Sequence, residues 1–94
     1  MYRPLPKELR LGFSKIHDIG LFAKENIPKA TNFGMSHIQI SETIVRTPLG
    51  GFINHSDNPN CAKYEYEDGR YFIEVIKPIG PMEELTLKYT FYSV

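Results

Sequence analysis

Side chains able to do chemistry crowd into one segment near the middle of the chain. Residues 52–61 read Phe-Ile-Asn-His-Ser-Asp-Asn-Pro-Asn-Cys. Pro59 has no N–H to give to a helix or a strand ladder and pushes Asn58 toward an extended conformation, while Asn, Asp and Ser side chains bond to their own backbone in tight turns. The segment therefore predicts a structured polar loop, and polar loops held by a scaffold often carry function.

The loop residues also have a purely structural interpretation. Asn54 and Asn60 would serve as turn residues in any loop of this composition. A loop histidine such as His55 is most often a hydrogen-bonded side chain, and no proton transfer is assigned to it. Further residues are needed before the loop points to a particular chemistry.

A second segment with chemical potential lies near the C-terminal end. Residues 83–89, Glu-Glu-Leu-Thr-Leu-Lys-Tyr, alternate apolar and polar side chains and predict a strand that delivers Tyr89 to its end. Glu83 and Glu84 are adjacent on that strand, so their side chains face opposite sides. They are therefore not expected to cooperate as a catalytic carboxylate pair.

Together the two segments resemble the SET domain family of lysine methyltransferases. The resemblance rests on Asn-His-Ser-x-x-Pro-Asn-Cys followed about thirty positions later by Glu-Glu-Leu-Thr-x-x-Tyr. Residues 18–23, Asp-Ile-Gly-Leu-Phe-Ala, are similar to the family's Gly-x-Gly-Leu-Phe-Ala opening turn. The similarity extends over most of residues 13–92.

The resemblance implies a mainly β fold, the β-clip-like SET fold of several small sheets with a knot-like C-terminal crossing. It also implies S-adenosylmethionine as the cofactor. Asn54 and His55 would contact its adenine and sugar end, partly through backbone groups. The turn at Asp18, Ile19 and Gly20 would lie along the methionine portion, and Tyr89 would be the catalytic tyrosine where cofactor and substrate lysine meet.

The implied function is a protein-lysine N-methyltransferase acting on a lysine of a partner protein. Methyl transfer from a sulfonium to an amine is an in-line displacement, so alignment matters more than acid–base machinery. The lysine must arrive neutral, and an aromatic channel next to a sulfonium lowers its pKa. A tyrosine hydroxyl such as that of Tyr89 can hold the amine and contact the methyl group.

Three positions and two segments depart from the family pattern. Asp18 replaces the first glycine of the opening turn, where it tolerates left-handed geometry but adds a charge near the cofactor carboxylate. Ala30 replaces a usual glycine and Gly51 a common arginine. Only about ten residues, 41–50, stand where the family carries a longer insert that binds substrate peptide, and no cysteine-rich segment follows Tyr92 to form a zinc-bound lid.

These departures leave two alternatives open. The chain could be a SET-like binding module without catalysis, or a homodimer in which a second copy completes the site. A further alternative is a small β interaction domain whose tyrosines stack on nucleic acid or peptide. Eleven basic and eleven acidic residues cancel, which argues against direct nucleic-acid binding or an anionic membrane surface.

Regular short strands predict the scaffold. Strands are expected at 9–13, 20–23 and 33–40, with a hairpin of 60–66 and 70–76 around Glu67-Asp68-Gly69 and a short helical turn at 41–47. Tyr64 and Tyr66 are expected to pack across strands, with a channel-lining role as the alternative. The predicted core comprises Leu21, Phe22, Ile38, Phe52, Ile53, Ile73, Val75, Leu85 and Leu87.

Length and composition predict one small domain, residues 1–94. Cys61 is the single cysteine and is expected to be a small buried residue, which excludes an internal disulfide. His17 and His37 have no ligand-spaced partners, so no metal site is predicted. Without a signal-peptide core or a run of about 20 apolar residues, the chain is expected to be soluble and intracellular, cytoplasmic or, in a eukaryote, nuclear.

Overall fold

The computed structural model describes residues 5–66 and 68–88. In these residues eight short strands and one short helix follow one another along the chain. They are β1 (Leu9–Phe13), β2 (Ile19–Ala23), β3 (Asn32–Ile40), β4 (Thr43–Arg46), α1 (Pro48–Phe52), β5 (Asn54–His55), β6 (Cys61–Glu65), β7 (Arg70–Val75) and β8 (Glu84–Leu87). The mainly β prediction is confirmed.

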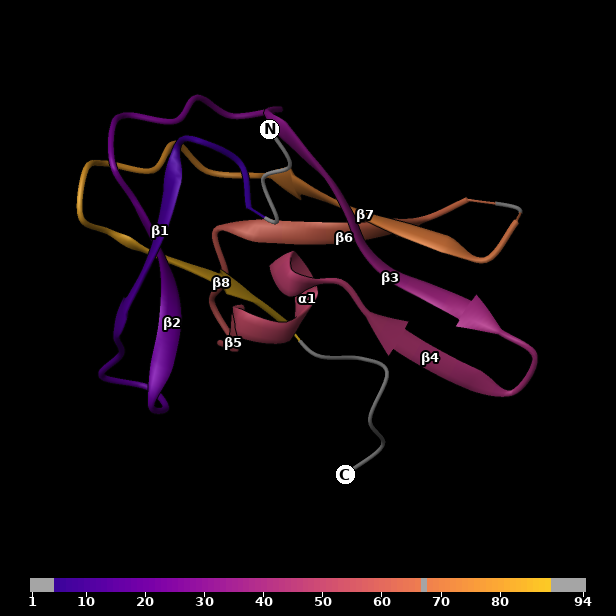
Figure 1. The fold of residues 1–94 in the computed structure, drawn as a ribbon. Helices are drawn as coiled ribbons and strands as arrows, with labels where there is room; N and C mark the ends of the chain where they lie inside the picture. Colours follow the sequence, from indigo (N-terminus) through magenta and orange to yellow (C-terminus); the bar gives the residue numbers. More distant parts are fainter. Residues whose placement is uncertain (1–4, 67, 89–94) are drawn as a thin grey trace.

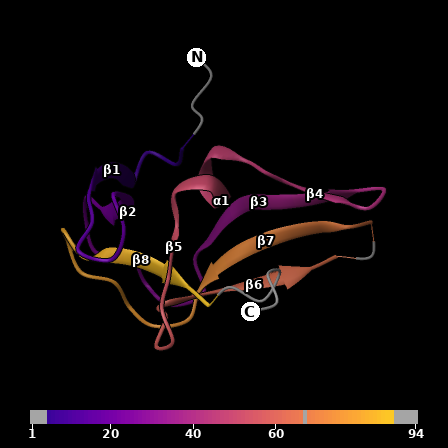
Figure 2. The ribbon, with the colours of Figure 1, turned by 90° about the horizontal axis from the view of Figure 1, so that it is seen from below.

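The last strand, β8, joins the β1–β2 hairpin to the strands β6, β7, β3 and β4. The strand order is β1-β2-β8-β6-β7-β3-β4, and β5 pairs with β8 outside this path. β8 is antiparallel to β2 and parallel to both β5 and β6. Figures 1 and 2 show the β1–β2 hairpin at one end of the molecule and the strands β3, β4, β6 and β7 extending away toward the other. β5 lies parallel beside β8, and the predicted knot-like C-terminal crossing would involve residues beyond Lys88, which fall outside the described residues.

The core is formed by buried side chains from the strands on both sides of β8 and from β8 itself. Six of the nine predicted core residues are fully or almost fully buried: Leu21, Ile53, Ile73, Val75, Leu85 and Leu87. Three predictions were wrong, since Phe22 and Ile38 are only half-buried and Phe52 is 38% exposed. Phe22 points to the opposite face of β2 from Leu21, where the guanidinium of Arg10 lies 5.1 Å from its ring centroid.

The predicted helical turn at 41–47 was also wrong. This segment forms the β3–β4 turn, with Ser41 at a φ of 57°, and then strand β4. The helix begins one residue later at Pro48, where a missing N–H costs nothing. Thr47 caps it, because its hydroxyl accepts a hydrogen bond from the Gly50 N–H at 3.4 Å.

The hairpin prediction was right. β6 and β7 pair antiparallel with Tyr64 opposite Phe72, and Gly69 adopts a φ of 83° at the turn. The carboxylate of Asp68 accepts the Arg70 N–H at 3.2 Å, as expected of Asp in a tight turn. Glu67 of the predicted turn lies outside the described residues.

Candidate functional site

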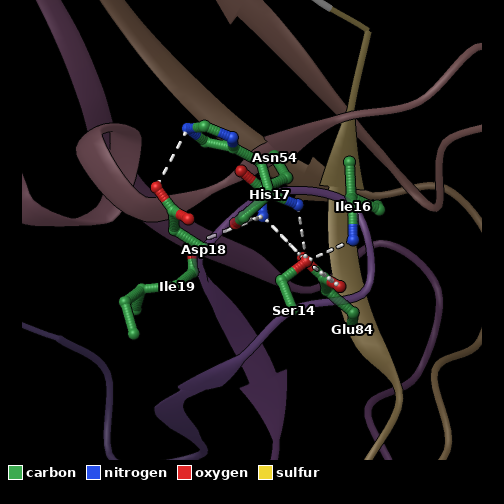
Figure 3. Close-up of polar contacts among 7 residues, drawn as sticks. All are labelled: Ser14, Ile16, His17, Asp18, Ile19, Asn54 and Glu84. Atoms are coloured by element: carbon green, nitrogen blue, oxygen red, sulfur yellow. Dashed lines mark hydrogen bonds and ion pairs between the residues drawn. The ribbon is translucent and has the colours of Figure 1, made fainter.

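The turn between β1 and β2 is organised by the Ser14 side chain (Figure 3). The backbone N–H groups of Ile16 and His17 donate to its Oγ at 2.9 and 3.3 Å. The Ser14 N–H closes the turn on the carbonyl of Asp18 at 2.8 Å. Asp18 has a φ of 37°, the left-handed backbone expected where the family carries glycine. The local sequence therefore fixes the shape of residues 14–18.

The side chain of Asn54 ties this turn to the middle of the chain. Its Nδ2 lies 3.1 Å from both Ser14 Oγ and the His17 carbonyl, and 3.4 Å from the Ile19 carbonyl. It lies 2.9 Å from Glu84 Oε2 as well. Asn54 is only 8% exposed, so its amide hydrogens are shared among acceptors inside the protein. The primary role of this side chain is to hold the turn in place.

Glu84 completes the cluster, and sequence reasoning missed it. The Ser14 hydroxyl donates to the carboxylate, with 2.8 and 2.9 Å to the two oxygens. Gly20 leaves the room for this carboxylate, since a Cβ at that position would lie 2.3 Å from Oε2. Ser14 and Glu84 are 70 residues apart, and the available signal was only that Glu84 belongs to the Glu-Glu-Leu-Thr segment.

The two adjacent glutamates serve different partners, as their predicted opposite orientation requires. Glu83 accepts from the Gly80 N–H at 2.9 Å and from Asn60 Nδ2 at 3.4 Å. Asn60 is buried, and its side chain also donates to the Glu84 carbonyl and accepts from the Thr86 N–H, both at 2.9 Å. Asn60 therefore fastens the polar loop to β8, which is a structural role.

Strand β5 runs beside the organised turn. Asn54 is paired with Thr86 and His55 with Leu87, and the Ser56 N–H donates to the Leu87 carbonyl at 3.1 Å. Among the described strands only β8 pairs with β5, so its other edge has no strand partner. The exposed ring of His55 lies 3.2 Å from Asp57.

The structure thus brings five predicted site residues into one corner: Asp18, Ile19, Gly20, Asn54 and His55. We call this the turn–β5 corner. The main-chain groups of the fixed turn and of β5 are the groups in this corner that would hold an adenosine-type ligand with an amino-acid arm. The sixth predicted residue, Tyr89, lies outside the described residues.

Other candidate groups in the described residues have structural explanations. Cys61 is fully buried as predicted, and burial raises the pKa of its thiol to about 12. His37 lies in β3 and is buried beside Ser36, whereas His17 is exposed next to Asp18. No cluster of three or more His, Cys, Asp or Glu able to hold a metal occurs in residues 5–66 and 68–88. The helix in these residues, α1, is not long and apolar enough to cross a membrane.

Comparisons with known proteins agree with this architecture. The SET domain family model matches residues 36–90. The chain is 34% identical over 119 residues to a histone-lysine N-methyltransferase of Aspergillus fumigatus described as specific for lysine 4 of H3. That match covers 90% of this chain and 10% of the relative, so the chain spans about a tenth of the length of the curated protein it matches.

Two solved structures share the fold. The methyltransferase domain of human PR domain-containing protein 2 aligns with a TM-score of 0.74 and 21% identity, over 96% of this chain and 82% of that one. A candidate histone methyltransferase of Plasmodium falciparum aligns with a TM-score of 0.72 and 16% identity, over 94% of this chain and 97% of that one. With the family model matched over more than half of the sequence, the chain belongs to the SET domain family.

Proposed function

We propose that this chain binds S-adenosylmethionine in the turn–β5 corner and transfers its methyl group to a lysine side chain of a protein. The observation that carries the proposal is the part-buried, hydrogen-bonded cluster of Ser14, Asn54 and Glu84, which fixes the β1–β2 turn beside β5. Membership of the SET family and the histone-lysine methyltransferase name of the curated relative support the same activity.

Each residue of the corner has a proposed role. The backbone at Asp18, Ile19 and Gly20 holds the amino-acid arm of the cofactor, and the backbone of Asn54 and His55 holds the adenine end. Because the Asn54 amide is engaged with Ser14 and Glu84, Asn54 positions the turn and binds cofactor through its main chain. The bound cofactor supplies an electrophilic methyl group on a sulfonium.

Tyr89 is proposed as the residue that orients the substrate amine. In the sequence it stands two residues after Leu87, the last residue of β8, which is paired with His55 of β5. A phenol can hold a neutral amine by hydrogen bonding, and in-line displacement needs that alignment more than a strong base. The turn–β5 corner is therefore proposed to align, rather than to deprotonate, its substrate.

The proposed substrate is a lysine in a basic protein tail, with a histone tail as the first candidate because of the name of the curated relative. A histone substrate would place the protein in the nucleus. The test incubates the purified chain with methyl-deuterated S-adenosylmethionine and histone H3, and maps label by tandem mass spectrometry. We expect label on lysine with the unmodified chain and none with Tyr89→Phe; equal labelling by both would contradict the role of Tyr89.

A second candidate is a SET-type binding module without turnover. It is favoured by the short connection between β3 and α1, in which β4 and its turns take up the whole segment. This candidate predicts that S-adenosylmethionine binds while no protein lysine acquires label. Labelled lysine in the same experiment would exclude it.

A further inference from the structure

A groove on the outer face of the β6–β7 hairpin is the second feature of the molecule suited to a ligand. It is lined by Asn32, Tyr64, Tyr66, Phe72 and Glu74 and encloses about 390 Å³. We call it the aromatic groove. The hairpin extends away from the β1–β2 hairpin in both Figures 1 and 2, so the groove is separate from the turn–β5 corner.

Strand geometry explains why these side chains share one face. Tyr64 is opposite Phe72, and Glu74 is opposite Asn32 on β3. Directly opposed residues point to the same side of a sheet. The alternate residues of the same two strands, Cys61, Ile73 and Val75, are fully buried, so the core lies on the other side. The aromatic groove is therefore on the side of the sheet turned away from the core.

The rings of the groove remain accessible. Tyr64 is 47% and Tyr66 is 48% exposed. The ring of Phe72 packs against Tyr66, with centroids 4.5 Å apart at an angle of 34°. This contact pairs Phe72 with Tyr66, and Tyr64 and Glu74 line the same groove. An aromatic face next to a carboxylate attracts a cation by two additive electrostatic effects.

The two charged side chains that β7 places on this face differ in whether their charge is already paired. Arg70, Phe72 and Glu74 follow at two-residue steps on the same face. Arg70 lies over the Phe72 ring, 5.6 Å from its centroid, and is neutralised by Asp68 at 2.6 Å. The side chain of Glu74 is half-buried and makes no hydrogen bond or ion pair with any described residue. A partly desolvated carboxylate beside accessible rings is complementary to a cation from outside the chain.

We propose that the aromatic groove docks a basic protein segment by taking one of its lysine or arginine side chains between Tyr64 and Glu74. The aliphatic part of such a side chain packs on the rings, and its charged end meets the carboxylate. The groove binds this segment without any chemical change. This docking goes beyond methyl transfer in the turn–β5 corner and needs no cofactor.

The test is an NMR titration of the full 15N-labelled chain, without cofactor. The probes are the Nα-acetyl methylamides of lysine and arginine, with that of norleucine as the uncharged control. We expect saturable shifts at Tyr64, Phe72 and Glu74 with both cationic probes and none with norleucine. Equal shifts with norleucine, or no saturable shift at the groove, would overturn the proposal.

Matched variants separate the contribution of the Glu74 charge to binding from that of the aromatic rings. Glu74→Gln is expected to weaken binding roughly three- to fivefold, as loss of one partly exposed charge partner does, while Glu25→Gln removes an equal charge from an exposed loop and should change nothing. Tyr64→Leu should weaken binding by a similar factor, and Phe13→Leu, at an exposed ring outside the groove, should not. Unaltered affinity in both Glu74→Gln and Tyr64→Leu would also overturn the proposal.

Discussion

At the scale of single residues, Asn54 is the side chain on which the turn–β5 corner depends most. Asn54→Asp keeps its shape but replaces the donor of four contacts by a carboxylate facing Glu84. Loss of buried donors and like-charge repulsion should lower the free energy of unfolding by about 2–3 kcal/mol, measured by urea unfolding. Asn58→Asp is the control, since its exposed side chain only accepts from Lys77. Equal stability of the two variants would contradict the role of Asn54.

Gly20 and Glu84 form a second residue-scale test through a double-mutant cycle. Gly20→Ala places a Cβ 2.3 Å from Glu84 Oε2 and should cost about 2–3 kcal/mol of stability by forcing that carboxylate out of the cluster. Once Glu84→Ala has removed the carboxylate, adding Gly20→Ala should cost little more. Urea unfolding of the four proteins measures this coupling. Strictly additive losses would mean that Gly20 and Glu84 do not interact as described.

His37 predicts a dependence of stability on pH. Burial, together with the positive charges of Arg46 and Lys63, lowers its pKa from 6.5 to about 4. Between these values the unfolded chain takes up a proton that the folded chain does not, so stability falls as pH drops from about 6.5 to about 4. The fall due to this residue is about 3 kcal/mol. In urea unfolding, His37→Gln should lose stability less steeply over that range; identical slopes would refute the assignment.

Sequence reasoning found the residues of the turn–β5 corner but missed two residues that support it, for a physical reason. Asn54 and Gly20 lie within short motifs whose spacing is visible along the chain. Ser14 and Glu84 are hydrogen-bonded although 70 residues separate them in the sequence, and no local sequence pattern predicts that contact. The family resemblance implied a cofactor contact of Asn54 partly through backbone groups, and its side chain is engaged with the protein's own acceptors.

At the scale of elements, two neighbouring glycines of α1 make a matched pair. A Cβ at Gly50 would lie 2.1 Å from the Ser36 carbonyl oxygen of β3, whereas a Cβ at Gly51 would meet nothing within 4 Å. Gly50→Ala should therefore destabilise the fold by about 3 kcal/mol. Gly51→Ala should be neutral or stabilising by up to about 1 kcal/mol, because alanine favours the helix. Thermal unfolding checks both; similar melting temperatures would show that α1 does not pack this closely on β3.

Element predictions succeeded where side-chain alternation or turn chemistry was strong. The β6–β7 hairpin followed from Asp68 and Gly69, and β1 followed from its alternating residues. Residues 43–46 became β4 instead of a helical turn because β3 offers them a strand to pair with, from Ile40 opposite Thr43 to His37 opposite Arg46. That pairing is a tertiary contact, and local propensity does not contain it.

At the scale of the whole molecule, β8 joins the β1–β2 hairpin to the strands β6, β7, β3 and β4. It pairs with β2 on one side and with β5 and β6 on the other, so one strand contacts both the segment after the opening turn and the segments that flank the polar loop. The sequence could suggest this arrangement only through family resemblance, since strand order between distant segments leaves no periodic signal. Phe22, Ile38 and Phe52 were wrongly predicted to lie in the core for the same reason, since the sequence does not show which faces of the strands and of α1 pack together.

The measurement that tests the central claim most directly is calorimetric titration of S-adenosylmethionine into the purified chain. The unmodified chain and Asn58→Asp should bind one equivalent with micromolar affinity, and Asn54→Asp should bind on the order of tenfold more weakly because its turn is no longer held. Absence of saturable binding to the unmodified chain, or equal affinity in Asn54→Asp, would contradict the claim that the turn–β5 corner is the cofactor site.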